Sequence, residues 1–369
     1  MPMRKSVAII GTRGYPSYYG GFETLVRQLS PYLADEGWDV TVYGRPGNTV
    51  ATDSSRDPRV ECVDTRGLEA KCFSTLSYGL TSTLHATKRR PDVALVMNVA
   101  NGYWLPLLKA KRIPTIVNVD GMEWERAKWG SAAKAAFKLG ARLTATFADD
   151  IVVDSHEIGR RWSEEFKREG IFIPYGGTVP IRPPAVETLP DRGYALMIAR
   201  FVPENTVAEF FDAAEQVSRH WDVLIVGSSG YGGEFDSRAR RLASTNERIE
   251  WLGHVKDDTK LFALWAHAGA YFHGHSVGGT NPALVQAMAC GAPTVARDTP
   301  YNREVLEDAG VYVDPNGDSI AAALAEVLSD QALQDRLSTA AFARQQSMYT
   351  WEQVNKKYAE VLWAATQAT

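Results

Sequence analysis

The chain has 369 residues, which is enough for about two domains of ordinary size. Its 45% hydrophobic and 23% charged residues are typical of a globular protein, and its net charge of −4 disfavours nucleic acid as a partner. The three cysteines are an odd number without metal-site spacing, which argues against a disulfide scaffold and a metal site. No apolar run approaches the roughly 18 residues of a membrane span, so we expect a cytoplasmic protein.

Short apolar runs alternate with helical patterns through the first half of the chain. The run Ser6–Gly11 is continuous, as expected for a strand that is buried on both faces, and a helical pattern over Phe22–Leu33 follows it. Further strands are predicted at Asp39–Tyr43, Asp92–Val96, Thr115–Val119 and Ile151–Val153. This alternation predicts a parallel sheet that is covered by helices.

The alternation stops at residues 180–192, where four prolines indicate a linker, and then resumes. Strands are predicted at Ala195–Ala199, Val223–Val226, Ile249–Leu252, Ala270–Phe272, Thr294–Ala296 and Val311–Val313. Helices are predicted at Glu204–Ser218, Leu261–Ala268, Asn281–Ala289 and throughout the chain after Asp318.

We therefore predict an α/β fold of two Rossmann-like, doubly wound domains, residues 1–180 and 193–348, which face each other across a cleft. A C-terminal helix within residues 349–369 is expected to pack back toward the first domain. Ligands of open parallel sheets bind beyond the carboxyl ends of the strands, so the loops at those ends are the candidate binding sites.

The loop over residues 11–23 follows the first predicted strand and leads into a helix. Gly20 and Gly21 stand just before that helix, where backbone amides are able to face an anion or a sugar hydroxyl, and we predict that both residues bind the ligand that donates the transferred group. A turn that serves only packing would explain the glycines. It would not explain the costly side chains that the loop also carries: Arg13, Tyr15, Tyr18 and Tyr19.

A second loop, over residues 273–286, lies between a predicted strand and a helix. Thr280 or Asn281 is suited to cap the helix and Pro282 to begin it, while Gly278 and Gly279 leave amides uncovered, which favours a diphosphate site. His273 and His275 are expected to share a side and to act as hydrogen-bonding groups rather than metal ligands. Arg200 ends another strand and is suited to neutralise a diphosphate, or else to form a surface ion pair.

Six segments together resemble the family 4 glycosyltransferases of the GT-B fold, and especially bacterial rhamnosyltransferases of surface-polysaccharide assembly. They are GTRGYPSYYGGFET, NVDGMEWERAKW, VVDSHEI, IPYGG, ARFVPEN and HGHSVGGTNPALVQAMACGAPTVA. The resemblance extends over essentially the whole chain. It implies a nucleotide-sugar donor site in the second domain, a saccharide or lipid-linked acceptor site in the first, retention of configuration, and no metal or other cofactor. The implied donor is dTDP-rhamnose.

The resemblance also implies roles for single residues. Arg200 matches a diphosphate-binding arginine of the family, whereas Asn205 replaces a lysine. Gly278 and Gln286 replace two glutamates, and Gln286 remains able to hydrogen-bond hydroxyl groups. His254 and Val255 are the implied contacts of the nucleotide base.

Asp120 stands where the family commonly has a histidine. Asp120 or Glu123 is therefore a candidate to touch the reacting sugar or the acceptor hydroxyl. The alternative for Asp120 is that it caps a helix.

Residues 126–142 contain five basic and no acidic residues. Lys134, Lys138 and Arg142 would share one face of a helix, and Ala133, Phe137 and Gly140 another, which is compatible with an anionic membrane surface or with an ordinary solvated face. Two other functions stay open. One is a nucleotide-sugar epimerase on the same fold, and the other is a non-catalytic subunit that binds a sugar nucleotide.

Overall fold

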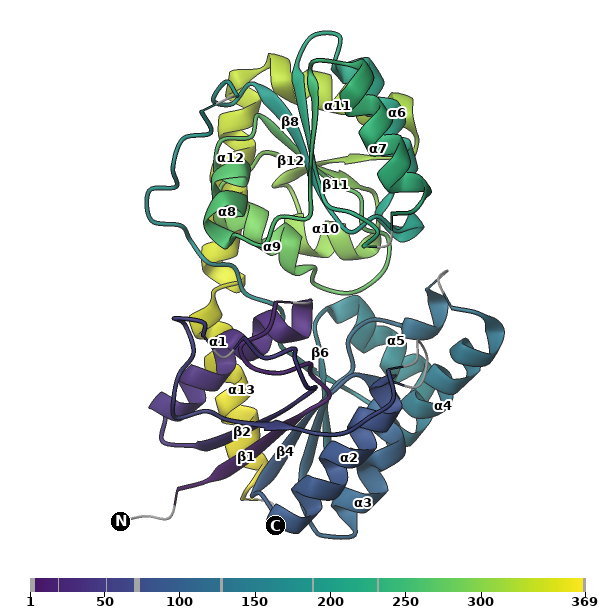
Figure 1. Cartoon of the computed structure of the whole chain (residues 1–369), viewed down its shortest axis with the longest axis vertical. Helices are drawn as coiled ribbons and strands as arrows, with labels where there is room; N and C mark the ends of the chain where they lie inside the picture. Colours follow the sequence, from purple (N-terminus) through teal and green to yellow (C-terminus); the bar gives the residue numbers. More distant parts are fainter. Residues whose placement is uncertain are drawn as a thin grey trace. The chain divides into compact units, whose positions relative to one another are not determined.

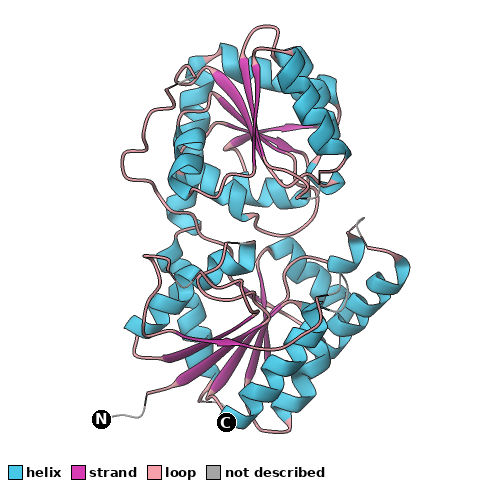
Figure 2. Cartoon of the chain, viewed as in Figure 1, coloured by secondary structure: helices cyan, strands magenta, loops and turns pink. Residues whose placement is uncertain are grey.

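The computed structural model describes residues 4–18, 20–50, 52–69, 74–126, 129–187, 189–230 and 232–367. The chain divides into two compact units (Figure 1). Unit 1 comprises Met1–Pro174 and Trp351–Thr369, and unit 2 comprises Tyr175–Thr350. Each unit contains one parallel sheet with helices on both sides (Figure 2). The predicted pair of Rossmann-like α/β folds is thereby confirmed.

The sheet of unit 1 has the strand order β3-β2-β1-β4-β5-β6-β7. Its strands are β1 (Ser6–Ile10), β2 (Asp39–Gly44), β3 (Glu61–Asp64), β4 (Val93–Met97), β5 (Thr115–Asn118), β6 (Asp150–Val153) and β7 (Ile171–Phe172). Its helices are α1 (Gly21–Asp35), α2 (Ser74–Arg89), α3 (Leu105–Lys109), α4 (Ser131–Phe147), α5 (His156–Phe166) and α13 (Trp351–Ala365), with 3-10 turns η1 (Val99–Trp104) and η2 (Glu123–Glu125). Every residue of β4 is buried, as a strand covered on both faces requires.

The sheet of unit 2 has the order β10-β9-β8-β11-β12-β13. Its strands are β8 (Tyr194–Ile198), β9 (Asp222–Val226), β10 (Ile249–Gly253), β11 (Ala270–His273), β12 (Thr294–Arg297) and β13 (Gly310–Val313). Its helices are α6 (Val207–Val217), α7 (Glu234–Thr245), α8 (Asp258–Ala266), α9 (Pro282–Ala289), α10 (Pro300–Leu306), α11 (Gly317–Ser329) and α12 (Gln331–Met348), with the 3-10 turn η3 (Pro203–Asn205).

The helix predicted at Glu204–Ser218 begins later than expected. Thr206 has a left-handed backbone with φ of 56°, which separates η3 from α6. Its hydroxyl donates a hydrogen bond of 2.6 Å to the carbonyl of Gly274. This buried contact holds a non-glycine residue in a backbone region that costs about 1 kcal/mol or more, and the helix therefore starts at Val207.

The last helix, α13, packs on unit 1 although it follows the whole of unit 2 in the sequence. Tyr358 accepts a hydrogen bond of 2.7 Å from Asn118 at the end of β5, and both side chains are buried. Trp363 meets Trp38 edge to face, with ring centroids 6.0 Å apart. The chain thus returns to unit 1 for its final helix, which Figure 1 shows as a yellow helix among the purple and blue elements.

Helix α4 lies against η1 through two glycines. A Cβ atom on Gly102 would stand 2.2 Å from the carbonyl oxygen of Gly140 and 2.5 Å from Oγ1 of Thr144. No side chain fits at this distance, so the two backbones approach as closely as they do only because residue 102 is glycine.

We expect Gly102→Ala to destabilise unit 1 by about 1–3 kcal/mol, because the new methyl group forces α4 away from η1. Gly130→Ala at the N-cap of α4 is the matched control, since a Cβ there meets nothing within 4 Å in the described part of the chain. Urea unfolding of both variants measures the difference. Equal stability of the two variants would contradict the packing described.

Candidate functional site

The loop that follows β8 presents Arg200. The Arg200 side chain is exposed, while its carbonyl accepts hydrogen bonds from the amide of Val202 (2.9 Å) and from Nδ2 of Asn205 (2.8 Å). Asn205 itself is buried. Asn205 thus closes the turn that carries Arg200, and its side-chain amide stabilises the backbone of that turn.

The loop that follows β11 packs directly on the β8 loop. Ser276 donates hydrogen bonds of 2.9 Å to the carbonyl of Glu204 from both its amide and its hydroxyl. A Cβ on Gly274 would lie 2.3 Å from the carbonyl oxygen of Asn205, so only glycine permits this contact. The two loops therefore form one unit at the place where the strand order reverses on either side of β8.

The predicted glycine-rich segment stands between β11 and α9. Gly278 has φ of +109° with open space around its Cβ position, while Gly279 and Thr280 are buried. Asn281 caps α9 by accepting a hydrogen bond of 2.9 Å from the amide of Ala283, and Pro282 is the first residue of the helix. The predicted cap and helix start are confirmed. The binding of a diphosphate by Gly278, Gly279, Thr280 and Asn281 stays a prediction.

Arg297, at the end of β12, was not predicted as a site residue. Its Nη1 donates a hydrogen bond of 3.1 Å to Oγ1 of Thr206 in the β8 loop. Since β11 lies between β8 and β12, the arginine side chain crosses the carboxyl end of β11. Asn302 fixes its backbone by donating to the Arg297 carbonyl at 2.8 Å and to that of His275 at 3.0 Å. A strand-end arginine in the segment TVARD was the available sequence signal.

Gln286 lies in a structural contact. Its Oε1 accepts from the amide of Thr178 at 2.9 Å and its Nε2 donates to the carbonyl of the same residue at 2.7 Å. These two bonds hold the segment through which the chain enters unit 2. His254 and Val255 follow β10; His254 is exposed, and Val255 packs partly buried against the core of unit 2.

His273 is fully buried at the end of β11. Its Nδ1 is 3.0 Å from the hydroxyl of Tyr271, and its ring stacks on His275 at 4.4 Å between centroids. Its Nε2 is buried and has no hydrogen-bond partner among the described residues. The hydrogen-bonding role and the shared side of the two histidines are as predicted. Burial lowers the pKa of His273 to about 3, so the ring is neutral at physiological pH.

In unit 1 the first loop is folded tightly over the ends of β1 and β2. The amide of Arg13 donates to Glu23 at 3.0 Å, and Thr12 donates to the carbonyl of Tyr43 at 3.1 Å. Gly20 is the N-cap of α1 and Gly21 its first residue, with no side chain capping the helix. Tyr19 lies outside the described residues. Gly20 and Gly21 thus stand at the helix start, as predicted.

Asp120 follows β5 with a left-handed backbone, φ of 57°. Its amide donates to Oδ1 of Asn118 at 3.0 Å, and its carboxylate is 3.9 Å from Nη2 of Arg126. The alternative that Asp120 caps a helix is wrong, because the next helical turn, η2, begins at Glu123 with Met122 as its cap. A strained residue with a half-buried carboxylate at a strand end fits a functional position.

Glu123 is buried and held on both carboxylate oxygens. Arg126 binds Oε1 at 2.5 Å and the indole of Trp129 donates to Oε2 at 3.0 Å. The structure thus brings Asp120 and Glu123 together around Arg126, with Asp120 the more exposed of the two.

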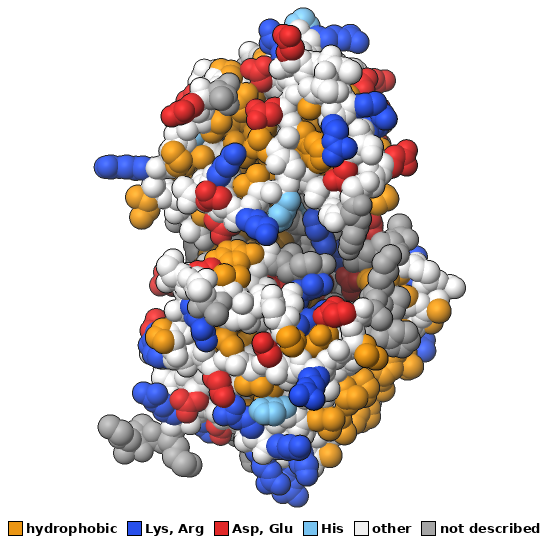
Figure 3. All heavy atoms as spheres, viewed as in Figure 1, with side chains coloured by type: hydrophobic (Ala, Val, Ile, Leu, Met, Phe, Trp, Pro, Cys, Tyr) orange, Lys and Arg blue, Asp and Glu red, His pale blue; other side chains and the backbone are white. Residues whose placement is uncertain are grey.

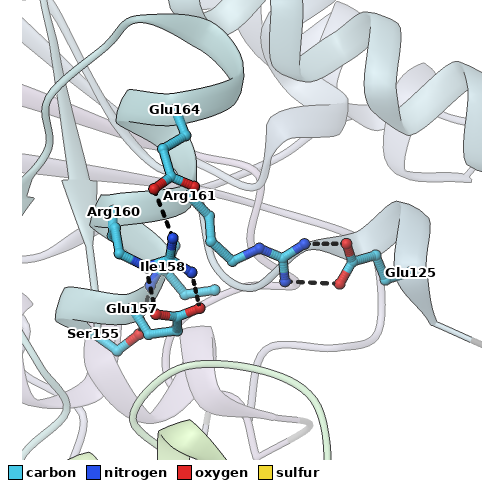
Figure 4. A network of polar contacts seen from close by, with 7 residues as sticks. All are labelled: Glu125, Ser155, Glu157, Ile158, Arg160, Arg161 and Glu164. Atoms are coloured by element: carbon cyan, nitrogen blue, oxygen red, sulfur yellow. Dashed lines mark hydrogen bonds and ion pairs between the residues drawn. The ribbon is translucent and has the colours of Figure 1, made fainter.

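A polar network fixes the turn that carries Glu123 (Figure 4). Arg161 of α5 binds both oxygens of Glu125, one of them at 2.8 Å. On the same helix Arg160 bridges Glu157 and Glu164, each at 2.7 Å. Ser155 caps α5 by accepting from the amide of Ile158 at 3.1 Å. The pair of Arg161 with Glu125 ties η2 to α5, and the other bonds lie within α5 and its cap.

Within the described part of the chain, no group of three or more His, Cys, Asp or Glu side chains is arranged to hold a metal ion. None of the described helices combines the length and apolar character that crossing a bilayer requires.

Comparison with known families gives each unit a separate match. Residues 184–344 match the model for glycosyl transferases group 1. Residues 4–178 match a domain of unknown function, DUF1972. The loops after β8 and β11 both lie within the residues that match the group 1 model.

Curated relatives include the O-antigen chain mannosyltransferase B of Escherichia coli, which is 30% identical over 44% of this chain and 43% of its own length. The phosphatidyl-myo-inositol mannosyltransferase of Mycobacterium leprae is 30% identical over 54% of each chain. The chain therefore spans about half the length of these relatives.

Solved structures of similar fold cover nearly the whole chain. Sucrose-phosphate synthase of Thermosynechococcus elongatus has a TM-score of 0.81 at 18% identity, over 99% of this chain and 100% of its own. Anabaena HepE in complex with UDP has a TM-score of 0.75 at 16% identity, over 98% of this chain and 100% of its own. At these identities the likeness shows the fold, and the predicted GT-B class is confirmed.

Acid is expected to destabilise unit 2 through His273. The unfolded chain binds a proton near pH 6.5, whereas the folded chain resists protonation down to about pH 3, so stability is lost as pH falls through this window. Between pH 7 and pH 5 the loss amounts to about 2 kcal/mol. Unfolding midpoints at both pH values measure it. His273→Gln should remove this part of the pH dependence, whereas His220→Gln, at an exposed histidine, should retain it.

Proposed function

We propose that the protein is a retaining glycosyltransferase. It transfers a hexosyl group, for which rhamnosyl is our favoured identity, from a nucleotide-diphosphate sugar to a saccharide or lipid-linked acceptor. The proposal rests on one observation. The loops after β8 and β11 are hydrogen-bonded to each other where the strand order of the sheet reverses, within the residues that match the group 1 model. The names of the curated relatives, which are mannosyltransferases, support transfer of a hexose.

In this proposal unit 2 binds the donor. Arg200 and Arg297 neutralise the diphosphate as the glycosidic bond lengthens, and the amides of residues 278–281 hydrogen-bond its oxygens. Arg297 supplies the second positive charge of the site, since Asn205 has none and its side chain supports the Arg200 turn. Guanidinium groups and amides, rather than a metal ion, thus stabilise the leaving group. His254 and Val255 remain the proposed contacts of the base.

Unit 1 binds the acceptor in this proposal. The carboxylate of Asp120 hydrogen-bonds the attacking hydroxyl, while Glu123 holds Arg126 in position and so fixes the charge beside Asp120. Gly20 and Gly21 offer the backbone amides at the start of α1 to sugar hydroxyl groups.

The experiment supplies dTDP-rhamnose, GDP-mannose and UDP-glucose, each with a labelled sugar, together with a bacterial lipid extract. We expect one label to enter the lipid fraction, with kcat/KM falling roughly 100-fold or more in Arg200→Ala and about 10-fold or more in Arg297→Met. Arg303→Met is the matched control, because that arginine is paired with Asp298 at 2.6 Å on the protein surface.

Two results would replace the proposal. Conversion of the nucleotide sugar without transfer indicates an epimerase. Binding of a donor without any turnover indicates a non-catalytic subunit. If transfer occurs but Arg297→Met behaves like Arg303→Met, Arg297 has no part in donor binding.

We also propose that α4 rests on an anionic membrane surface. Its outward residues Ala132, Ala135 and Leu139 form an apolar stripe, and hydrophobic side chains gather over this part of unit 1 in Figure 3. Lys138 pairs with Glu165 at 2.6 Å, and Lys134 is half-buried. Exposed basic residues nearby are Arg142 and the C-terminal ends of α2 and α3: Lys88, Arg89, Arg90, Lys109, Lys111 and Arg112.

An apolar stripe beside a cationic rim complements a surface of anionic lipids. We expect Leu139→Glu to lower flotation with vesicles of phosphatidylglycerol and phosphatidylcholine several-fold, since it places a charge in the stripe. Leu68→Glu, at another exposed leucine of unit 1, should float like the unmodified chain. Flotation that is unchanged by Leu139→Glu, or equal on uncharged vesicles, excludes this surface.

A further inference from the structure

Arg45 is a buried arginine whose hydrogen-bonding groups are not satisfied. It directly follows β2, and only 5% of the residue is exposed. Among the described residues, no hydrogen-bond partner reaches its Nε and Nη1 atoms, although both are buried. Leaving such donors unpaired costs about 1–3 kcal/mol each, more when they are charged, so a structural role alone does not account for them.

The contacts of Arg45 engage one face of its guanidinium group and leave Nε and Nη1 without an acceptor among the described residues. The guanidinium carbon lies over the ring of Tyr78, 4.9 Å from its centroid, which satisfies one face of the group. The N–H donors point along the plane rather than toward a stacked ring. An acceptor in that plane is therefore what the site lacks.

The surrounding charges do not supply the acceptor. Burial lowers the pKa of Arg45, and the positive charge of Arg13 lowers it further, whereas Glu69, Tyr78 and Glu23 raise it. In the described part of the chain, none of these carboxylates forms an ion pair with Arg45, and Glu23 instead accepts from the amide of Arg13. Arg45 thus lies near a second cation, and none of these described carboxylates accepts a hydrogen bond from its Nε or Nη1.

The position of Arg45 points to a ligand of unit 1. Its amide donates to the carbonyl of Arg13 at 2.9 Å, which joins the loops that follow β1 and β2. Both loops stand at the carboxyl edge of the parallel sheet, where ligands of this class of fold bind. Arginine presents two parallel donors that match the oxygens of a phosphate or a carboxylate.

We propose that Arg45 binds an oxyanion, namely a phosphate or carboxylate group carried by the acceptor. The assignment to the acceptor rests on the proposed function, whereas the anion site itself stands on Arg45 and its surroundings. The enzyme would then select an acidic acceptor over its neutral counterpart.

The test measures thermal unfolding of the whole chain against sodium phosphate and, separately, sodium glucuronate, at ionic strength held constant with sodium chloride. We expect saturable stabilisation by at least one of the two anions, and the one that acts identifies the group. Arg45→Met should weaken the apparent affinity roughly 10- to 100-fold. Without anion, this variant should unfold at the same temperature as the unmodified chain or higher, because it no longer buries an unpaired charge.

Arg90→Met is the control for general charge effects, since Arg90 is an exposed arginine at the end of α2. Arg45→Lys should bind with intermediate affinity, because it keeps the charge and loses the paired donors. The proposal is overturned if neither anion stabilises the unmodified chain, or if Arg90→Met loses as much affinity as Arg45→Met. The measurement needs no turnover, so it stands apart from the failure or success of the transferase assay.

Discussion

The reversal of strand order beside the first strand of each sheet is the constraint on which the rest depends. In unit 2 β8 lies between β9 and β11, and in unit 1 β1 lies between β2 and β4. Connections leave such a strand toward opposite sides, so the loops at its carboxyl end are free to form a binding site. Arg200 follows β8, and the loop of Arg13 follows β1. The same topological rule thus positions the candidate groups of both units.

The site of unit 2 is built from backbone contacts that tolerate little change. Gly274 allows the β11 loop to contact the carbonyl of Asn205. Thr206 has a left-handed backbone, and its hydroxyl donates a hydrogen bond to the carbonyl of Gly274. The same Thr206 hydroxyl accepts a hydrogen bond from Arg297, so one side chain links the β8 loop to both the β11 loop and a cationic side chain. The Arg297 side chain and the turn that carries Arg200 are therefore fixed by contacts within unit 2, which reduces the reorganisation that ligand binding would require.

The sequence predicted the buried strands well, because runs such as VALVM are apolar throughout. It did not reveal β3 or β7, since ECVD is half-exposed and β7 has two residues. The left-handed backbone of Thr206 was not predicted, because threonine rarely adopts positive φ without a tertiary contact. That contact is the carbonyl of Gly274, which lies 68 residues away in the sequence. The hydrogen bonds between Gln286 and Thr178, which lies 108 residues away in the sequence, were not predicted, and the contact of Gln286 with the sugar donor stays a prediction. No local sequence pattern predicts a role for Arg45, because that role is inferred from buried N–H groups that have no hydrogen-bond partner among the described residues.

The return of α13 to unit 1 makes that unit discontinuous along the chain. During synthesis residues 175–350 emerge before residues 351–365, so unit 2 is complete while unit 1 still lacks a helix. Until α13 arrives, Asn118 has no Tyr358 to receive its hydrogen bond, and Trp38 has no Trp363. The order of translation therefore places the docking of α13 after the synthesis of unit 2, so unit 1 completes its fold only once the whole of unit 2 has been made.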